Sequence, residues 1–171
     1  AKANAAVALV SVKATAFIGG DGTLNAGTVL VQAEGVTSSL AQVESPKYQV
    51  GVATIAVNAM LSKLAAAQKA YILGVRILGA DSVTVLSELN KDGNTAATAK
   101  LSANGGGVAV GLVDARANIA VALADCSSHA FMAGVAMDGG ALSVLSDASS
   151  IASAKVETAS FSASYASLGL N

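Results

Sequence analysis

The residues that could perform nucleophilic catalysis lie in one short segment, Asp125-Cys126-Ser127-Ser128-His129, which holds the only cysteine and the only histidine of the chain. A catalytic thiol needs a base and an orienting group within hydrogen-bond reach, and this segment contains all three residue types. The simpler interpretation is that Cys126 packs as a small apolar group. Zinc needs about four ligands, so one cysteine and one histidine do not predict a metal site.

A second possible chemistry is the cleavage of polysaccharides, because glycosidases use a pair of carboxylates. The eleven acidic residues are mostly spread one to a turn, however, as at Asp21, Asp81, Asp92, Asp138 and Asp147. The Gly105-Gly106-Gly107 run lacks the lysine and the following serine or threonine of a phosphate-binding loop. We therefore predict no catalytic residue, no metal and no cofactor. A β-helical polysaccharide lyase or hydrolase remains the alternative function.

Composition narrows the class of protein further. The 171 residues are 53% hydrophobic but only 12% charged and 4% aromatic, and the net charge is −1. Scattered lysines and arginines form no basic stripe, so we expect no nucleic-acid partner. No apolar run reaches the roughly 20 residues that a membrane-spanning helix requires. Small and β-branched side chains favour narrow, regular layers of strands.

An internal repeat organises the chain. Three copies of an aromatic-to-strand stretch open at Phe17, Tyr71 and Phe131, which are 54 and 60 residues apart. Each copy has alanine, an aromatic and a large apolar residue, then glycine, then an alternating run such as 82–87. An aromatic residue at a fixed place in every repeat predicts a ladder of rings, and such rings are usually buried.

A second landmark recurs as an alternating apolar run that ends in a polar residue. Its copies align Val12 with Val57, Val113 and Leu170. The polar residues that follow the last three are Asn58, Asp114 and Asn171, which we expect to stack as a polar ladder. With this alignment, the segments 60–69 and 116–129 have almost no counterpart in the first unit. We interpret them as excursions from the repeating frame, either short helices or extended loops.

The pattern between the landmarks has a period of two, broken by glycine-rich bends, and so predicts an all-β array of short strands. Repeats of this length fit a parallel β-helix, or β-solenoid, with two or three coils of roughly 20 residues in each unit. A β-sandwich would not explain two landmarks that repeat in phase. A transmembrane barrel would need aromatic girdles that six aromatic residues cannot supply. We predict a single solenoid segment over residues 1–171, built from about three imperfect repeats.

Runs such as 107–115, 130–134 and 140–146 resemble large repetitive bacterial exoproteins of the filamentous haemagglutinin-like and leukotoxin-like kind. The resemblance covers nearly the whole chain and rests on a degenerate pattern of alanine, valine and glycine. It implies a right-handed β-helix, a secreted or cell-surface location, and a structural or adhesive role. It supplies no catalytic residue.

These expectations combine into a stiff rod that presents contact surfaces. Uncapped solenoids expose strand edges and apolar layers. The expected partners are therefore neighbouring repeats of a longer chain, further copies through open solenoid ends, or host and cell-surface molecules. A self-assembling extracellular fibre subunit is a further alternative.

Overall fold

The computed structural model describes residues 2–44, 48–50, 52–93, 96–102, 107–157 and 160–170. Every regular element in these ranges is a β-strand, and none is a helix. The strands are β1 (Lys2–Gly19), β2 (Thr23–Asn25), β3 (Thr28–Gly35), β4 (Ser39–Glu44), β5 (Tyr48–Val50), β6 (Ala53–Leu73), β7 (Arg76–Leu78), β8 (Ser82–Leu89), β9 (Ala97–Ser102), β10 (Gly107–Ala133), β11 (Ala136–Asp138), β12 (Ala141–Ala148), β13 (Ala152–Val156) and β14 (Ser160–Leu170).

The strands form four parallel sheets that repeat in the same order along the chain. The long sheet has the order β1-β6-β10-β14, and β5 also pairs with β10. The end sheet is β2-β7-β11, and the two return sheets are β3-β8-β12 and β4-β9-β13. We call one passage through all four sheets a circuit, so that β1–β4, β6–β9 and β10–β13 form three circuits. This arrangement is consistent with a parallel β-solenoid.

Each circuit takes up a whole sequence repeat. Lys2 pairs with Ala56, an offset of 54 residues, and Ala53 pairs with Val113, an offset of 60. The predicted coils of about 20 residues are therefore wrong. The segments 60–69 and 116–129 are the middle and end of long strands in β6 and β10, so they are neither helices nor loops.

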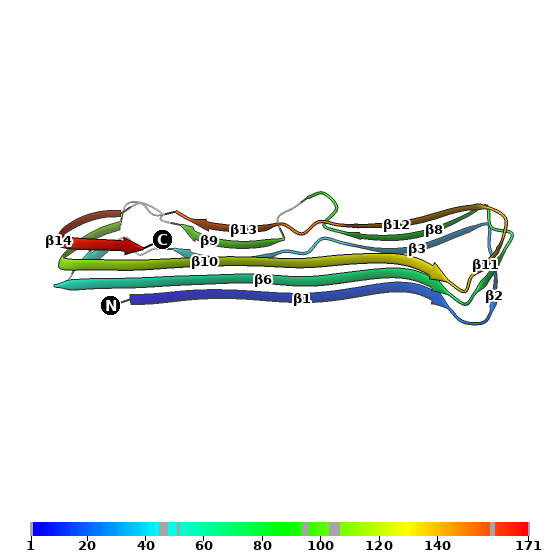
Figure 1. The fold of residues 1–171 in the computed structure, drawn as a ribbon, viewed down its shortest axis with the longest axis horizontal. Coiled ribbons are helices and arrows are strands. Elements are labelled where there is room, and N and C mark those ends of the chain that lie inside the picture. The colour runs from blue at the N-terminus through cyan, green and yellow to red at the C-terminus, as the bar shows by residue number, and fades with distance from the viewer. Residues whose placement is uncertain are drawn as a thin grey trace.

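The circuit is flattened, and the molecule is longest along its strands (Figure 1). The long strands β1, β6 and β10 run side by side, the end sheet turns the chain at one end, and the return sheets run back along the other layer. The 27 residues of β10 span about 90 Å, whereas neighbouring strands are only about 4.8 Å apart. Three circuits therefore make a thin slab, in place of a rod elongated along the stacking direction.

Glycines close the turn from the long sheet to the end sheet. Gly74 and Gly134 both have positive φ, at 70° and 62°, a conformation that costs little only for glycine. A Cβ on Gly74 would also lie 2.9 Å from the carbonyl oxygen of Gly20 in the preceding circuit. The turns of successive circuits therefore stack closely because they lack side chains.

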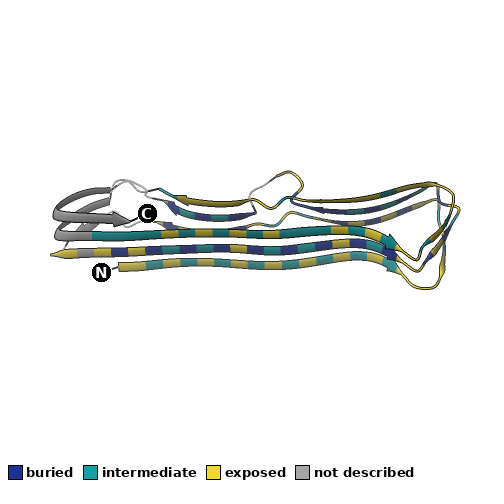
Figure 2. Ribbon diagram, in the orientation of Figure 1, coloured by how far each residue is buried: buried dark blue, intermediate teal, exposed yellow. Residues whose placement is uncertain are grey.

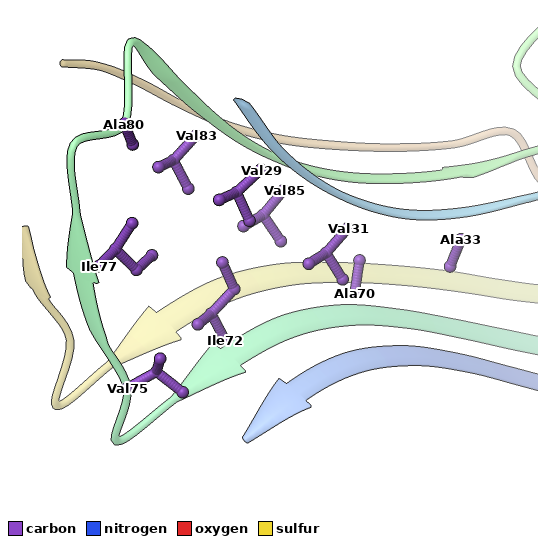
Figure 3. Close-up of a cluster of buried hydrophobic side chains, with 10 residues drawn as sticks. All are labelled: Val29, Val31, Ala33, Ala70, Ile72, Val75, Ile77, Ala80, Val83 and Val85. Atoms are coloured by element: carbon purple, nitrogen blue, oxygen red, sulfur yellow. The ribbon is translucent and has the colours of Figure 1, made fainter. Parts of the chain in front are cut away.

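The core is a narrow layer between the long sheet and the return sheets. The middle circuit is the most deeply buried (Figure 2), because the first and third circuits cover it on both sides. In the cluster of Figure 3, Ile72 and Ile77 meet Val83 and Val85, and all four are fully buried. Alternate residues of each strand enter this layer, as the period of two predicts.

Polar side chains join the two layers where the return strands break. The hydroxyl groups of Ser39 and Ser62 lie 2.7 Å apart in the core. The buried amide of Gln68, in the orientation that satisfies its neighbours, donates to the carbonyl oxygens of Ala33 and Glu88 and accepts from the N–H of Gly35. Buried polar groups need such partners, so these contacts fix the position of one layer relative to the other.

Candidate functional site

The structure separates the thiol from the imidazole. Cys126 pairs with Ala66 and belongs to a core cluster with Leu64 and Leu89. His129 pairs with Lys69 on the opposite, outward face of the long sheet. Successive side chains of a strand point to opposite faces, so residues three positions apart lie on different faces. Cys126 and His129 therefore cannot act together within one copy of this chain.

Phe17, Tyr71 and Phe131 form one stacked column on the long sheet. Their ring centroids are 5.4 Å and 5.0 Å apart, with interplanar angles of 17° and 10°. They belong to adjacent circuits, so the prediction of intervening coils is wrong. Phe17 is 62% exposed and Phe131 39% exposed, so the column lies on the outer surface rather than in a buried corner. The rings cover one another's faces and leave their edges to solvent.

Asn58 does belong to a polar ladder, but its partners differ from the predicted ones. It accepts a hydrogen bond from the amide of Asn4 at 2.9 Å and donates one to Asn118 at 2.8 Å. Asp114 instead pairs with Thr54 and Ser167 along the strands, so it does not lie opposite Asn58. Asn171 lies outside the described residues.

The outward surface of the long sheet, which we call the front face, is mainly aliphatic. It exposes columns of Val, Leu and Ile side chains, which include Val7, Leu9, Ile119, Val121 and Leu123. Contiguous apolar surface of this kind commonly marks a contact surface.

Charged groups on the front face lie close to the aromatic column. Lys69 pairs with Thr15 and His129 in the neighbouring strands, two positions before the aromatic rings. Lys13 pairs with Ala67, two positions further back. Asp125 lies near Lys13 across a shallow depression whose lining includes Ala65 and Ala67.

The outward surface of the β3-β8-β12 sheet, which we call the back face, carries a column of acids. Glu34, Glu88 and Asp147 are paired in register, one from each circuit. Glu34 and Asp147 are exposed, whereas the side chain of Glu88 is only 11% exposed. Like charges that face each other on neighbouring strands are destabilising. Lys91 offsets this repulsion, because its Nζ lies 2.6 Å from Oε1 of Glu88.

The acids raise the pKa of Lys91 above its ordinary value of 10.5, chiefly through the hydrogen bond from Lys91 to Glu88 and the charge of Glu88, with Asp147 and Glu34 adding to the effect. Beside the column lies an open pocket of about 320 Å³. The pocket is lined by Glu34, Gly35, Val36, Glu88, Lys91 and Asp92. Charged side chains from two circuits thus share one hollow.

Sequence reasoning missed the acidic column, although a signal was present. Glu34 and Glu88 each follow the aromatic residue of their repeat by 17 positions, and Asp147 follows by 16. Alignment on the aromatic residues, with a gap of one residue in the third repeat, would have placed the three acids in one column. The rest of the asparagine ladder was hidden because Asn4 and Asn118 were not aligned with Asn58.

Comparisons with known proteins add no identification: no protein family, no curated protein and no solved structure matches this chain. Within the ranges that the structure describes, no three His, Cys, Asp or Glu side chains are arranged to hold a metal ion. The same ranges contain no helix long and apolar enough to cross a membrane.

Proposed function

We propose that this chain is a structural, adhesive segment of a secreted or cell-surface bacterial protein, folded as a right-handed β-solenoid of three imperfect repeats. One observation carries the proposal: every described sheet takes one strand from each successive circuit, always in parallel. Such stacking joins the backbone of each circuit to the next and leaves two broad outer faces for contact. The resemblance to repetitive bacterial exoproteins supports the location and the adhesive role.

Further circuits, from a longer chain or from another copy, are the proposed partners of the open end. Val83 and Val85 are fully buried in the second circuit, whereas their partners in the third circuit, Leu142 and Val144, are 55% and 40% exposed. Inward-facing aliphatic side chains gain about 25 cal/mol for each Å² that is removed from water. Stacking of one more circuit would supply that burial.

The acidic pocket is the observation that favours the alternative, a polysaccharide-active enzyme. It brings Glu34 of the first circuit beside Glu88 and Asp92 of the second, and paired carboxylates are what glycosidases use. The 2.6 Å ion pair between Glu88 and Lys91 gives one of these acids a structural partner. Release of new sugar ends from a polysaccharide by this chain, lost in Glu34→Gln, would support the enzyme over the structural role.

The adhesive role is tested with beads that carry the protein. Beads coated with this chain should be retained under flow on cell monolayers severalfold better than beads coated with an inert protein. The paired variant Leu9→Ser with Leu123→Ser should abolish this retention, because both leucines are exposed on the front face, at 65% and 50%.

The matched control places the same change on the back face. Leu30 and Leu145 are each 56% exposed, so Leu30→Ser with Leu145→Ser should keep full retention. All four leucines face solvent, so both variants should melt close to the parent temperature. Retention no better than that of the inert protein would contradict the adhesive role, and equal retention by the two variants would contradict the front face as its site.

A further inference from the structure

Three groups that can donate hydrogen bonds to carboxylates lie together on the front face, one in each circuit. Lys69 of the second circuit pairs in register with Thr15 of the first and His129 of the third. Lys13 of the first circuit lies two positions before Thr15 along the same strand. Lys13, Lys69 and His129 therefore form a band across the slab, and all three are exposed.

The back face carries the complementary band. Glu34, Glu88 and Asp147 also come one from each circuit. The adjoining pocket of about 320 Å³ has three acids in its lining, Glu34, Glu88 and Asp92, against one lysine, Lys91. Lys91 pairs with Glu88, but Glu34 and Asp147 each add a further negative charge. The acidic band therefore has more negative charge than its own lysine balances.

The two bands lie directly opposite each other through the slab. Gln68 is adjacent to Lys69 on β6, and its inward amide contacts the carbonyl oxygens of Ala33 and Glu88 and the N–H of Gly35. These contacts place the donor band and the acid band at the same point along the strands, on opposite surfaces. A second copy shifted along the slab normal, without rotation, would therefore bring the donor band of one copy onto the acid band of the next.

We propose that the front face of this chain docks on the back face of a second copy, with Lys13 against Glu34, Lys69 over the pocket that Glu34 and Glu88 line, and His129 against Asp147. The return strands β3 and β4 have 8 and 6 residues, so three circuits of the back layer present about 650 Å² to the front face. This area approaches the ~800 Å² that each partner buries in a standard interface. The contact joins the front face of one copy to the different back face of the next. Because the copies are related by a shift without rotation, they cannot form a closed ring, and the contact produces an open stack of slabs. It is separate from the end-to-end contacts of the proposed function.

The lysines of the middle strand disfavour the obvious competitor, a two-fold pairing of two front faces. If the two-fold axis of that pairing runs parallel to the strands, the second circuit of one copy lies over the second circuit of the other. Lys63 would then face Lys63, and Lys69 would face Lys69. Like charges brought together at an interface oppose association, whereas the acidic back face accepts them.

Charge reversal with rescue tests this docking by sedimentation velocity of the whole chain. At about 20 mM salt the parent should associate, and about 0.5 M salt should weaken the association at least tenfold by screening. The front variant, Lys13→Glu with His129→Glu, and the back variant, Glu34→Lys with Asp147→Lys, should each weaken it at least about tenfold. An equimolar mixture of the two variants, and the variant that carries all four changes, should both recover association.

The control is Asp21→Lys with Asp138→Lys, which changes the net charge as much as the back variant does but lies at the end sheet, outside both faces. It should associate as the parent does. A parent that stays monomeric at low salt overturns the proposal. The proposal is also overturned if the front and back variants associate as strongly as the parent, or if the control variant associates as weakly as they do. It is likewise overturned if neither the mixture nor the four-fold variant recovers association. Failure of this test leaves the bead result, and hence the proposed function, untouched.

Discussion

Replacement of Asn58 by aspartate is expected to destabilise the fold by about 3 kcal/mol at pH 7, because it places an unpaired charge in the buried asparagine ladder. Asn58 is only 2% exposed. A carboxylate could still accept from Asn4, but it has no proton to donate to the amide oxygen of Asn118, which it would face at 2.8 Å. Urea denaturation monitored by circular dichroism measures the loss.

The pH dependence of Asn58→Asp identifies the cause. Burial raises the pKa of a carboxyl group above its ordinary value of about 3.9. The folded state of the variant therefore binds a proton more tightly than the unfolded state, so its deficit should shrink as the pH falls toward 4 and grow as the pH rises. Asn4→Asp is the matched control, because Asn4 is half-buried on an outer strand and should cost under about 1 kcal/mol. A variant as stable as the parent at pH 7 would show that the ladder is not a buried network.

Replacement of Gly140 by alanine should destabilise the fold by about 4 kcal/mol, in the range of the most damaging single substitutions. Gly140 has a φ of 87°, which an L-residue adopts only at a cost of about 1–2 kcal/mol. A Cβ there would also lie 2.1 Å from the carbonyl oxygen of Ala80. Because that oxygen belongs to the backbone of the neighbouring circuit, the two turns would have to move apart.

The adjacent glycine separates the two causes. Gly139 has a similar φ of 81°, but an added Cβ would meet nothing within 4 Å. Gly139→Ala should therefore cost only about 1–2 kcal/mol, the backbone strain alone. Guanidinium denaturation of both variants gives the comparison. Equal losses would mean that the circuits do not approach as closely at this turn as the structure shows.

The all-β fold followed from the sequence because the alternation of side chains is local, and the parallel strands followed from the landmarks that repeat in phase. Residues such as Val83 and Val85 occupy alternate positions and both face the core. The period of two in the sequence predicts this arrangement. The repeated turns could be predicted for the same reason. A turn that needs positive φ favours glycine, as at Gly74, so the glycines in the sequence mark the turns.

The register and the length of a circuit could not be predicted in the same way. Alanine and valine recur so often that Val12 could be aligned with Val57, although it pairs with Ala66. That misalignment made long strands look like excursions and assigned Asp114 to the ladder position of Asn118. Register is set by specific contacts, here the ring column and the asparagine ladder, and not by alternation alone.

The exposed aromatic column shows a further limit of sequence reasoning. Burial of Phe17 and Phe131 was expected from the general behaviour of aromatic rings. Alternation fixes only which residues share a face. Whether that face points inward depends on the layer opposite, and the return sheets cover the face of Ile72 rather than the face of Tyr71.

The central claim is that one circuit takes up one whole repeat, and a distance between two spin labels tests it most directly. Labels at Lys13→Cys and Ser127→Cys, with Cys126→Ala to remove the native thiol, would occupy the first and third circuits. Both positions pair with Ala67, so the two backbones should be about 10 Å apart. Electron paramagnetic resonance of labelled protein diluted into unlabelled protein should show strong dipolar broadening. Circuits of about 20 residues would place more than five circuits, or over about 25 Å, between these positions, and a spectrum without broadening would contradict the account.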